Sequence, residues 1–394
     1  MNSGGRSAAR ISYMKKHDPG ERYEEWEALG TAWGPDYRER FRGIWQPLRD
    51  AVQEGLIPGG VAGIRYKEGC LYYAVGLAEA GEKERHTGIH TLYDCASLTK
   101  VTVTLPLILM LWEQGKLDLD DRASIYIPEL NSPESSRITV RQLLSHTAGL
   151  PPTWNFHCSS WNLEQILHFL GNKVEFSGPE TVYSDLGFIL LGVIAERLLG
   201  TSINEAARMY LFSPLEMKES CFCPSPDLRF RIASTEWNEK LGGFWTGIVH
   251  DENARALGGI SGHAGLFATC PDLLKYAQLW LEPEQTQFEG KPILSRFVIN
   301  EAQKRQGNGL DPANRGLGWV LKGNRYDVSG SRLSDLSFGH TGFTGTSLYM
   351  DPQRGMAAVL MTNRVHFGRQ QDLTGLRTTF HDAAAEAVDH LTKE

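Results

Sequence analysis

The sequence predicts an α+β fold in which an antiparallel sheet, flanked by N- and C-terminal helices, is interrupted by an inserted and mostly helical domain. Two β-rich runs follow an amphipathic helix early in the chain, and strand-like segments return only after about residue 257. The residues between them are mainly in helical period. Because the early and late strands need each other's edges, we expect them to share one sheet.

The first elements follow from local patterns. Residues 1–35 are polar and predict a loosely held N-terminal arm. Apolar side chains then recur at helical spacing and stop at Gly55, which predicts a helix over about residues 37–54. Residues 61–66 and 70–75 are β-rich and are joined by Lys-Glu-Gly, so we expect two antiparallel neighbours.

The middle of the chain is predicted to be mostly helical. Residues 97–115 have the apolar density and terminal glycine of a buried helix, which we expect Pro106 to kink. Their charge-free stretch, 101–112, is shorter than the roughly 20 residues that span a bilayer. Helical period continues in "ITVRQLLSHTAGLPP" and "TVYSDLGFILLGVIAERLLGTSINEAARMYLFSPL". The helical domain is therefore assigned to residues 101–256.

The last third of the chain predicts the remainder of the sheet. The segments "GLGWVLK", "DLSFGHTGFTGTSLYMDP" and "GMAAVLMTN" are typical of three short strands separated by turns. The chain ends in "LRTTFHDAAAEAVDHLTKE", which has the pattern of a helix. The α/β sheet domain is accordingly assigned to residues 36–100 and 257–394.

Composition and charge argue against several classes of protein. The 394 residues include 40 Lys plus Arg and 47 Asp plus Glu, and the two signs are interleaved, so we expect neither nucleic acid nor a membrane as a partner. The six cysteines lack the spacing of a disulfide scaffold or an all-cysteine zinc site, which favours reduced thiols. Without the apolar core of a secretory signal, the N-terminal segment predicts a cytoplasmic protein.

A serine and a lysine stand three residues apart at the start of the apolar run. A serine hydroxyl becomes a nucleophile when a base takes its proton, and a desolvated lysine near Ser97, such as Lys100, can be that base. The spacing alone is weak evidence, because Ser12 and Lys15 repeat it and because Ser97 could simply cap a helix. Cys95 is a rival nucleophile, but without a basic partner nearby in sequence we expect it to be a buried hydrophobe.

Three motifs in order make the signal specific. "SLTK" from Ser97, "YSD" from Tyr183 and "HTG" from His340 resemble the motifs of the serine β-lactamase and penicillin-binding-protein superfamily, in its class C-like branch. That branch includes DD-carboxypeptidases, D-amino-acid peptidases and β-lactamase-like esterases. The resemblance covers most of the chain from about residue 40. It implies a β-lactamase-like fold with the active site in the cleft between the two domains.

The resemblance also implies roles on one side of this cleft. Ser97 would be the nucleophile, Lys100 its proton-handling partner, and Tyr183 the group that moves protons between serine, leaving group and water. Whether Lys100 or Tyr183 is the first base stays open. Asp185 stands where the family often has asparagine, and an ionised carboxylate only accepts hydrogen bonds. It either pairs with Lys100, which moves the base role to Tyr183, or receives an ammonium group of the substrate.

On the opposite wall, the resemblance implies that His340, Thr341 and Gly342 hold a substrate carboxylate or carbonyl. The backbone N–H groups of Ser97 and Phe343 would form the oxyanion hole. His340 replaces the lysine of typical β-lactamases, which weakens the fixed positive charge that anchors a β-lactam carboxylate. We therefore expect hydrolysis of esters or peptides rather than efficient hydrolysis of β-lactams.

Further polar residues have simpler interpretations. His250, Asp251, Glu252 and His263 fit no common zinc spacing, so we expect a substrate-side loop with internal hydrogen bonds, and no metal. Contact of His250 or Asp251 with substrate is the alternative. His146, at a predicted helix end, is expected to make structural hydrogen bonds rather than to join a catalytic triad.

Together these observations predict a metal-independent serine hydrolase that needs no cofactor and works through an acyl-enzyme. Its substrate would be a small ester, amide or peptide, as for an esterase or a D-amino-acid-type peptidase, with β-lactams as further candidate ligands. The alternative is a non-hydrolytic penicillin-binding or ligand-sensing module, which acylates and stalls or does not acylate. The natural substrate and the oligomeric state cannot be read from the sequence.

Overall fold

The computed structural model describes residues 23–30, 32–34, 36–159, 161–177, 181–306 and 314–392. Most of the predicted N-terminal arm, including Ser12 and Lys15, lies outside these residues. Its described part contains strand β1 (Glu24–Leu29), which pairs with an early strand of the sheet and corrects the prediction of a loosely held arm there. The reason is that Trp26 and Ala28 pack against the core, so this acidic stretch has one half-buried strand face.

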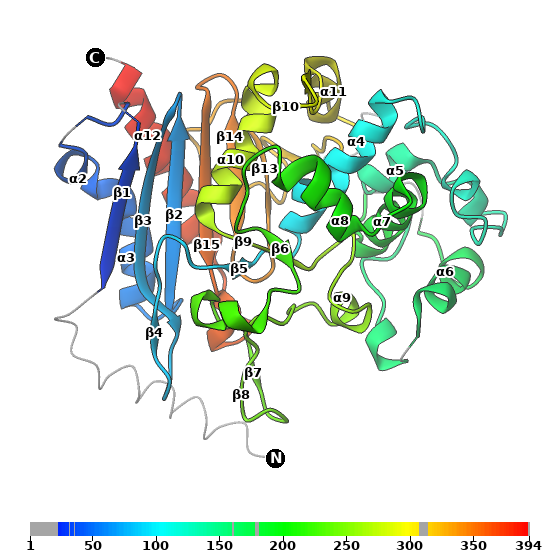
Figure 1. Ribbon diagram of the computed structural model, residues 1–394, viewed down its shortest axis with the longest axis horizontal. Helices are drawn as coiled ribbons and strands as arrows, with labels where there is room; N and C mark the ends of the chain where they lie inside the picture. Colours follow the sequence, from blue (N-terminus) through cyan, green and yellow to red (C-terminus); the bar gives the residue numbers. More distant parts are fainter. Residues whose placement is uncertain are drawn as a thin grey trace.

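An antiparallel sheet occupies the left half of the view in Figure 1, with the helices of the inserted region to its right. Within the described residues it contains eight strands. Strand β15 pairs with β2, so strands from opposite ends of the chain are neighbours, as predicted. The order is β1-β3-β2-β15-β14-β13-β12, with β4 beside β3. After β1, the strands are β2 (Gly59–Tyr66), β3 (Gly69–Glu79), β4 (Arg85–His86), β12 (Val320–Leu321), β13 (Phe338–Thr341), β14 (Ser347–Asp351) and β15 (Met356–Thr362).

The late part of the sheet differs from the prediction in one respect. The segment "DLSFGHTGFTGTSLYMDP" forms two strands, β13 and β14, rather than one. The chain reverses at Gly342 and Gly345, where the N–H of Gly342 donates to Thr346 and that of Gly345 donates to Gly342. This turn matters for the site, because it carries the end of the "HTG" motif.

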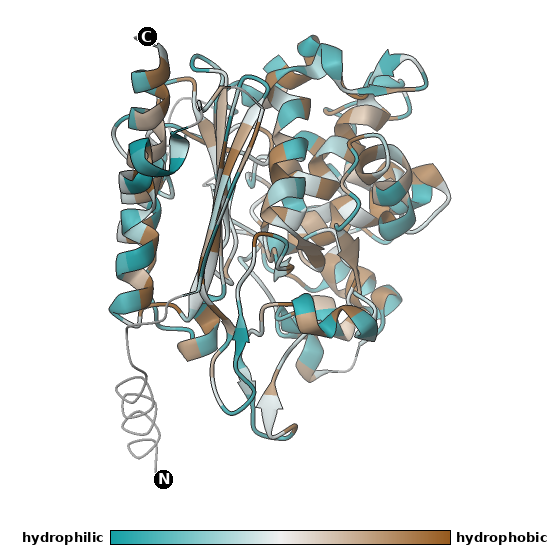
Figure 2. Ribbon diagram, turned by 60° about the vertical axis from the view of Figure 1, so that its left-hand side comes forward, coloured by the Kyte–Doolittle hydropathy of each residue, from teal (hydrophilic) through white to brown (hydrophobic). Residues whose placement is uncertain are grey.

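Helices cover both faces of the sheet (Figure 2). One face is covered by α2 (Tyr37–Arg40), α3 (Gln46–Gln53) and the C-terminal α12 (Thr374–Thr392), in a core that also contains the outer side chains of β2 and β3. The other face is covered by α10 (Cys270–Leu281), which contacts β15 and β2. A core side chain buried in this way contributes about 1.5–3 kcal/mol. The predicted flanking helices are thus present at both termini.

The inserted region packs beside the covered sheet. Its central helix is α7 (Asp185–Leu199), which packs against α4 (Leu105–Glu113) and α5 (Val140–Leu144). A small sheet, β5-β9-β6, joins its strand β6 to two strands from outside residues 101–256, and the stretch around β6, β7 and β8 consists of short strands, turns and a 3-10 helix rather than α-helices. The remaining elements are α6 (Leu163–Asn172), α8 (Ile203–Ala207), α9 (Glu252–Ala256), α11 (Arg296–Gln303), β5 (Tyr93–Asp94), β6 (Cys221–Phe222), β7 (Trp237–Asn238), β8 (Gly243–Phe244), β9 (Leu266–Ala268), β10 (Gln287–Phe288) and β11 (Lys291–Pro292).

A widened helical turn lies directly before Pro106, the residue at which the sequence predicts a kink. Residues Lys100–Thr104 form a π-helical turn, in which the N–H of Leu105 donates to the carbonyl of Lys100. Helix α4 then begins at Leu105, with Pro106 in its first turn, where the missing N–H costs little. The whole π turn is buried, so Lys100 is held in the interior at the start of this helix.

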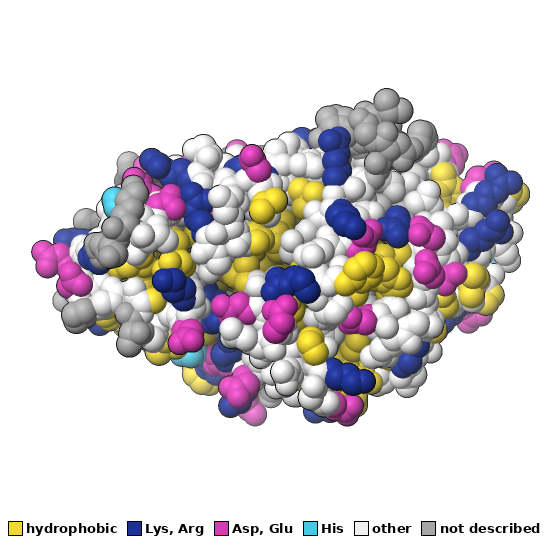
Figure 3. Space-filling view, turned by 90° about the horizontal axis from the view of Figure 1, so that it is seen from above, with side chains coloured by type: hydrophobic (Ala, Val, Ile, Leu, Met, Phe, Trp, Pro, Cys, Tyr) yellow, Lys and Arg dark blue, Asp and Glu magenta, His cyan; other side chains and the backbone are white. Residues whose placement is uncertain are grey.

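The surface carries charges of both signs. Lys and Arg side chains alternate with Asp and Glu over the face seen in Figure 3. Among the described residues, no single helix has the length and apolar composition needed to cross a bilayer, although the bent pair Asp185–Leu199 and Ile203–Phe212 meets both criteria jointly. All six cysteines are described, and each is a free thiol.

Candidate active site

Ser97 stands in a tight turn directly after strand β5. The buried carboxylate of Asp94 holds this turn, because it accepts from the N–H of Ala96 at 2.9 Å and from the N–H of His250 at 2.6 Å. Ala96 has a φ of 46°, a left-handed conformation that costs a non-glycine residue about 1–2 kcal/mol. The turn therefore presents Ser97 at the N-terminal end of a helical segment, and the next three N–H groups, from Leu98 to Lys100, already donate to carbonyls of the turn.

Lys100 is fully buried behind Ser97, and its ammonium has three acceptors. Its Nζ lies 2.9 Å from Ser97 Oγ, 3.1 Å from the carbonyl oxygen of His263 and 2.8 Å from Asp185 Oδ1. Burial favours the neutral amine, but the Asp185 carboxylate and then Tyr183 outweigh it, so the pKa of Lys100 is raised above its usual value.

The sequence left open whether Asp185 pairs with Lys100 or receives an ammonium group of the substrate. In the structure it pairs with Lys100. An ammonium with three acceptors donates to Ser97 and has no lone pair to take its proton. Asp185 is placed at the first position of α7, and it holds Lys100 in the charged form. Of the two candidate bases, Lys100 is therefore the one whose nitrogen already carries its proton.

Tyr183 is held by the histidine that the sequence analysis assigned to structure. His146 is buried, and its Nδ1 accepts from the N–H of Ser184 at 3.0 Å, directly between Tyr183 and Asp185. Its ring packs 4.6 Å from that of Tyr183 and 5.2 Å from that of Phe188. Burial, and then nearby positive charges, hold the pKa of His146 well below its usual range. His146 therefore positions the "YSD" motif as a neutral ring.

The "HTG" turn is bonded to the strand that precedes Ser97. Thr344 Oγ1 donates to the carbonyl of Asp94 at 2.6 Å, and Thr346 Oγ1 donates to that of Cys95 at 3.1 Å. A Cβ at Gly342 would lie 2.1 Å from Thr346 Oγ1 and 2.4 Å from the Cys95 carbonyl oxygen. Only glycine allows the turn to lie this close to the Cys95 carbonyl. The close contact brings the two walls of the site together.

Two arginines that the sequence analysis did not single out fix the same turn. Arg377 donates to the carbonyl of Gly342 at 2.9 Å, and Arg364 donates to that of Phe343 at 2.7 Å. Within the described part of the chain, the N–H groups of Ser97 and Phe343 have no protein acceptor. They are the two donors that the resemblance implies for an oxyanion hole. No local sequence pattern marks either arginine.

His340 presents an unprotonated nitrogen to the site. Burial, and then the charges of Arg315 and Lys100, hold its pKa well below the usual range. Its Nδ1 lies 2.8 Å from the carbonyl oxygen of Thr341, and since a carbonyl only accepts, the hydrogen of the neutral ring is on Nδ1. The buried Nε2 is then a lone pair with no partner among the described residues.

Arg315 is the most prominent residue that the sequence analysis missed. It is 2% exposed, and its Cζ lies 5.2 Å from the ring centre of Tyr183 and 5.8 Å from that of Tyr326. In the sequence it is a single basic residue directly before "GLGW". Its distance along the chain from the three motifs follows no pattern that would have identified it as a site residue. Only the folded chain brings it to Tyr183.

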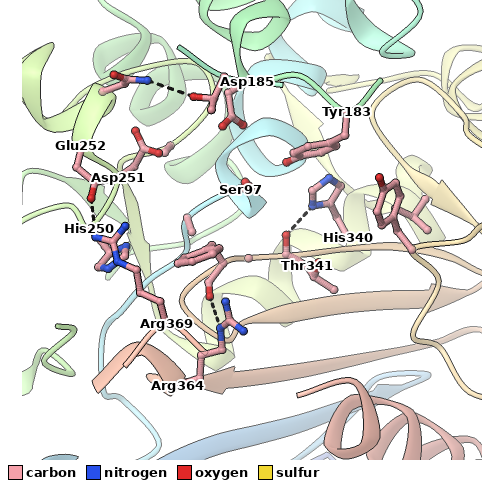
Figure 4. Close-up of a pocket in the computed structure, with 18 of the residues that line it drawn as sticks. Ser97, Tyr183, Asp185, His250, Asp251, Glu252, His340, Thr341, Arg364 and Arg369 are labelled. Carbon is pink, nitrogen blue, oxygen red and sulfur yellow. Dashed lines mark hydrogen bonds and ion pairs between the residues drawn. The ribbon is translucent and has the colours of Figure 1, made fainter. Parts of the chain in front are cut away.

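The loop that the sequence placed on the substrate side lies on the wall opposite His340 (Figure 4). His250 Nε2 lies 3.1 Å from Glu236, and His263 Nε2 lies 2.9 Å from Asp251. Hydrogen bonding to His250 contributes most to lowering the pKa of Glu236, to about 2. Over the described ranges, no three His, Cys, Asp or Glu side chains are grouped to hold a metal ion. The loop has the internal bonding that was expected.

These residues surround one cavity of about 570 Å³ (Figure 4). Seven of the eight predicted site residues line this cavity: Ser97, Tyr183, Asp185, His340, Thr341, Gly342 and Phe343. The eighth, Lys100, is buried behind Ser97. Cys95 is fully buried, and burial raises the pKa of its thiol well above the usual value, which leaves it an inert neighbour.

Comparison with known proteins agrees with this geometry. The family model described as Beta-lactamase matches residues 46–378. An "N-acetylmuramyl-L-alanine amidase" of Bacillus subtilis (strain 168) is 28% identical over 70% of this chain and 68% of its own length. A "Putative D-alanyl-D-alanine carboxypeptidase" of Escherichia coli (strain K12) is 30% identical over 70% of each chain.

A solved structure extends the likeness to the fold. The class C beta lactamase from Rhodobacter sphaeroides superposes with a TM-score of 0.69 at 18% identity, over 90% of this chain and 99% of that one. The fold, the site and these relatives define a serine hydrolase. The chain belongs to the beta-lactamase family.

Proposed function

We propose that the protein hydrolyses a small amide or ester of the esterase or D-amino-acid peptidase type, with Ser97 as nucleophile and Tyr183 as proton carrier. The observation that carries this proposal is the ion pair of 2.8 Å between Lys100 and Asp185. It keeps Lys100 an ammonium 2.9 Å from Ser97 Oγ. A fixed positive charge there stabilises a serine oxygen that is losing its proton.

The chemical steps follow from this arrangement. The Tyr183 oxygen takes the proton of Ser97 while Oγ attacks the substrate carbonyl. The N–H groups of Ser97 and Phe343 bind the resulting oxyanion. Tyr183 then gives its proton to the leaving amine or alcohol, and the acyl-enzyme forms. Water repeats the sequence in reverse, so that Ser97 regains its proton and the acid product leaves.

Two observations favour an amide or ester over a β-lactam. The ring of His340 is neutral, so the position of the family's strand lysine carries no charge for a β-lactam carboxylate. Two curated relatives bear the names "N-acetylmuramyl-L-alanine amidase" and "Putative D-alanyl-D-alanine carboxypeptidase", and both names denote the cleavage of an amide bond. We propose that the substrate of this chain is of similar chemistry, such as a cell-wall fragment.

The proposal is tested by turnover on a panel of substrates. p-Nitrophenyl esters, D-aminoacyl amides and a chromogenic cephalosporin are offered to the wild type and to Ser97→Ala. We expect sustained turnover of esters or amides, slow or absent turnover of the cephalosporin, and loss of at least about 10⁴-fold in kcat for Ser97→Ala. Full activity of that variant would reject Ser97 as the nucleophile.

The alternative, a binding module that stalls after acylation, gives a different time course. It releases one equivalent of p-nitrophenol per enzyme and then stops, whereas a hydrolase continues. A burst without turnover on every substrate of the panel would support the module and overturn the proposed hydrolysis. The mass of the intact protein after mixing distinguishes a stable acyl adduct on Ser97 from no reaction.

A further inference from the structure

The buried ring of His340 has one nitrogen without a partner in the cavity wall. The side chain is 3% exposed and lines the cavity, and its Nδ1 donates to the carbonyl of Thr341 at 2.8 Å. Within the described ranges, no group forms a hydrogen bond with Nε2. Because a buried polar atom without a partner is unfavourable, this nitrogen is suited to a group that the described chain does not supply.

The surroundings of His340 make this nitrogen an acceptor. The carbonyl of Thr341 only accepts, so the hydrogen of the neutral ring is on Nδ1 and Nε2 presents a lone pair. The positive charges of Arg315, Lys100 and Arg377 lie close enough to oppose protonation of the ring, and they lower its pKa together with burial. A lone pair accepts from an O–H or N–H group and repels a carboxylate oxygen. The group that fits Nε2 is therefore a hydrogen-bond donor.

Nearby donors of the described chain do not fill this position. The ring centre of Tyr183 lies 5.8 Å from that of His340, and its hydroxyl is on the side of Ser97 in Figure 4. Arg315 and Arg377 line the same cavity, but none of their N–H groups forms a hydrogen bond with Nε2. The donor must therefore come from a molecule that enters the cavity.

We propose that His340 determines specificity for the leaving group by accepting a hydrogen bond from a neutral hydroxyl or N–H group on it. This inference rests on the proposed function, in which Tyr183 gives the leaving group its proton. Because the ring of His340 lies beside that of Tyr183, a leaving group that reaches Tyr183 also passes Nε2. The substrate class is then an ester or amide whose leaving group has an uncharged donor close to the scissile bond.

The test compares two esters that differ in one donor. Both have the same acyl group, and the leaving phenol has either a hydroxymethyl or a methoxymethyl group at its meta position. Release is followed by absorbance and divided by the rate of spontaneous hydrolysis. For the wild type we expect kcat/KM to be about 3- to 10-fold higher for the hydroxymethyl ester, the range of a neutral hydrogen bond.

A second pair of esters distinguishes an N–H donor from a hydroxyl. The meta group is then a carboxamide or an N,N-dimethylcarboxamide, and only the first has N–H groups. A preference in either pair that depends on His340 supports the inference, and the pair that shows it identifies the donor. Absence of a preference in both pairs overturns it.

Variants separate hydrogen bonding from size. His340→Lys replaces an acceptor by a side chain that only donates, so the ratio of the two kcat/KM values should fall to within about twofold of one. His340→Gln supplies an acceptor oxygen and should keep part of the preference. Asn155→Ala is the matched control, because Asn155 is a polar side chain of the same cavity on another segment. It should keep the wild-type preference. A preference that is unchanged in His340→Lys, or that is also lost in Asn155→Ala, would overturn the assignment.

A further measurement needs no variant, in case His340→Lys does not fold. The product 3-(hydroxymethyl)phenol should inhibit the wild type at about 3- to 10-fold lower concentration than 3-(methoxymethyl)phenol. Added salt should leave this ratio unchanged, because neither partner is charged. A ratio that falls with salt would assign the effect to a charged group such as Arg315 and overturn the inference.

Failure of this inference differs from failure of the proposed function. Equal inhibition by the two products, with no preference within either pair of esters, overturns the role of His340 even though Ser97-dependent hydrolysis continues. Hydrolysis that survives Ser97→Ala would instead overturn the proposed function.

Discussion

The carboxylate of Asp185 lies 2.8 Å from the ammonium of Lys100, which is fully buried. Many members of this superfamily have an amide at the position of Asp185, and an amide cannot neutralise a buried ammonium. The pair raises the pKa of Lys100 and so favours its charged form, which is why we propose Tyr183 for the proton transfer. The charge state of the "SLTK" motif is thus determined by a residue outside it.

Asp185→Asn should reverse the pH dependence that Lys100 contributes to stability. In the wild type the raised pKa of Lys100 gives stability that is fully present below the unfolded pKa of about 10.4 and is lost only as the pH rises through the folded value. Without the carboxylate, burial becomes the larger influence and the pKa falls. The variant then binds fewer protons than its unfolded chain, so its stability rises with pH.

Urea unfolding of Asp185→Asn between pH 7 and pH 10 measures this effect. At pH 7 we expect the variant to be about 3–5 kcal/mol less stable than the wild type, as for a broken buried pair. The difference should shrink toward pH 10. A difference that is constant over this range would contradict the assigned charge of Lys100.

Tyr183→Phe should impair amide hydrolysis more than hydrolysis of an activated ester. A p-nitrophenolate leaves without a proton, whereas an amine must receive one, and we assign that proton to Tyr183. We expect kcat to fall about 10²- to 10⁴-fold on a D-aminoacyl amide and clearly less on the p-nitrophenyl ester. Equal losses on the two substrates would argue that Tyr183 acts before the leaving group departs, on Ser97 alone.

Gly342→Ala should damage the oxyanion hole. The new Cβ would lie 2.1 Å from Thr346 Oγ1, so the turn must move and carry the Phe343 N–H with it. We expect kcat to fall about 10²- to 10³-fold, the cost of one oxyanion donor. Gly375→Ala is the control, because a Cβ there has no neighbour within 4 Å and lies in the first turn of α12. That variant should keep wild-type kcat.

His381 should make the protein sensitive to mild acid. Burial lowers its pKa to about 3, so the folded protein keeps the ring neutral while the unfolded chain titrates near 6.5. A depressed histidine pKa means that stability is complete above pH 6.5 and is lost as the pH falls. Between pH 8 and pH 5 this residue alone should remove about 2 kcal/mol.

Replacing His381 by Asn checks this contribution, since the residue lies on α12 and its Nε2 reaches only Ser347 at 3.2 Å. The variant should lose less stability than the wild type between pH 8 and pH 5. If the two proteins lose the same amount, the acid sensitivity comes from other groups, such as His146 and His340.

The sequence predicted the fold where local patterns repeat regularly. Residues 61–66 and 70–75 lie within β2 and β3, and the C-terminal pattern became α12, because alternation and helical period survive in the folded chain. Strand β1 was missed because its apolar side chains, Trp26 and Ala28, are separated by acidic residues. The reversal between β13 and β14 was missed because strand-like residues continue on both sides of Gly342.

By itself, the sequence predicted that Ser97, Lys100, Tyr183 and the "HTG" strand share one site, because motifs in fixed order identify residue types and their family, and the structure brings these residues together. Only the tertiary structure decided the charges of these side chains. Charge depends on burial and on partners within a few ångströms, and Asp185, Arg315 and His146 reach the site from separate segments. The sequence thus predicts the nucleophile, while the packing around it sets the charges of the groups that surround it.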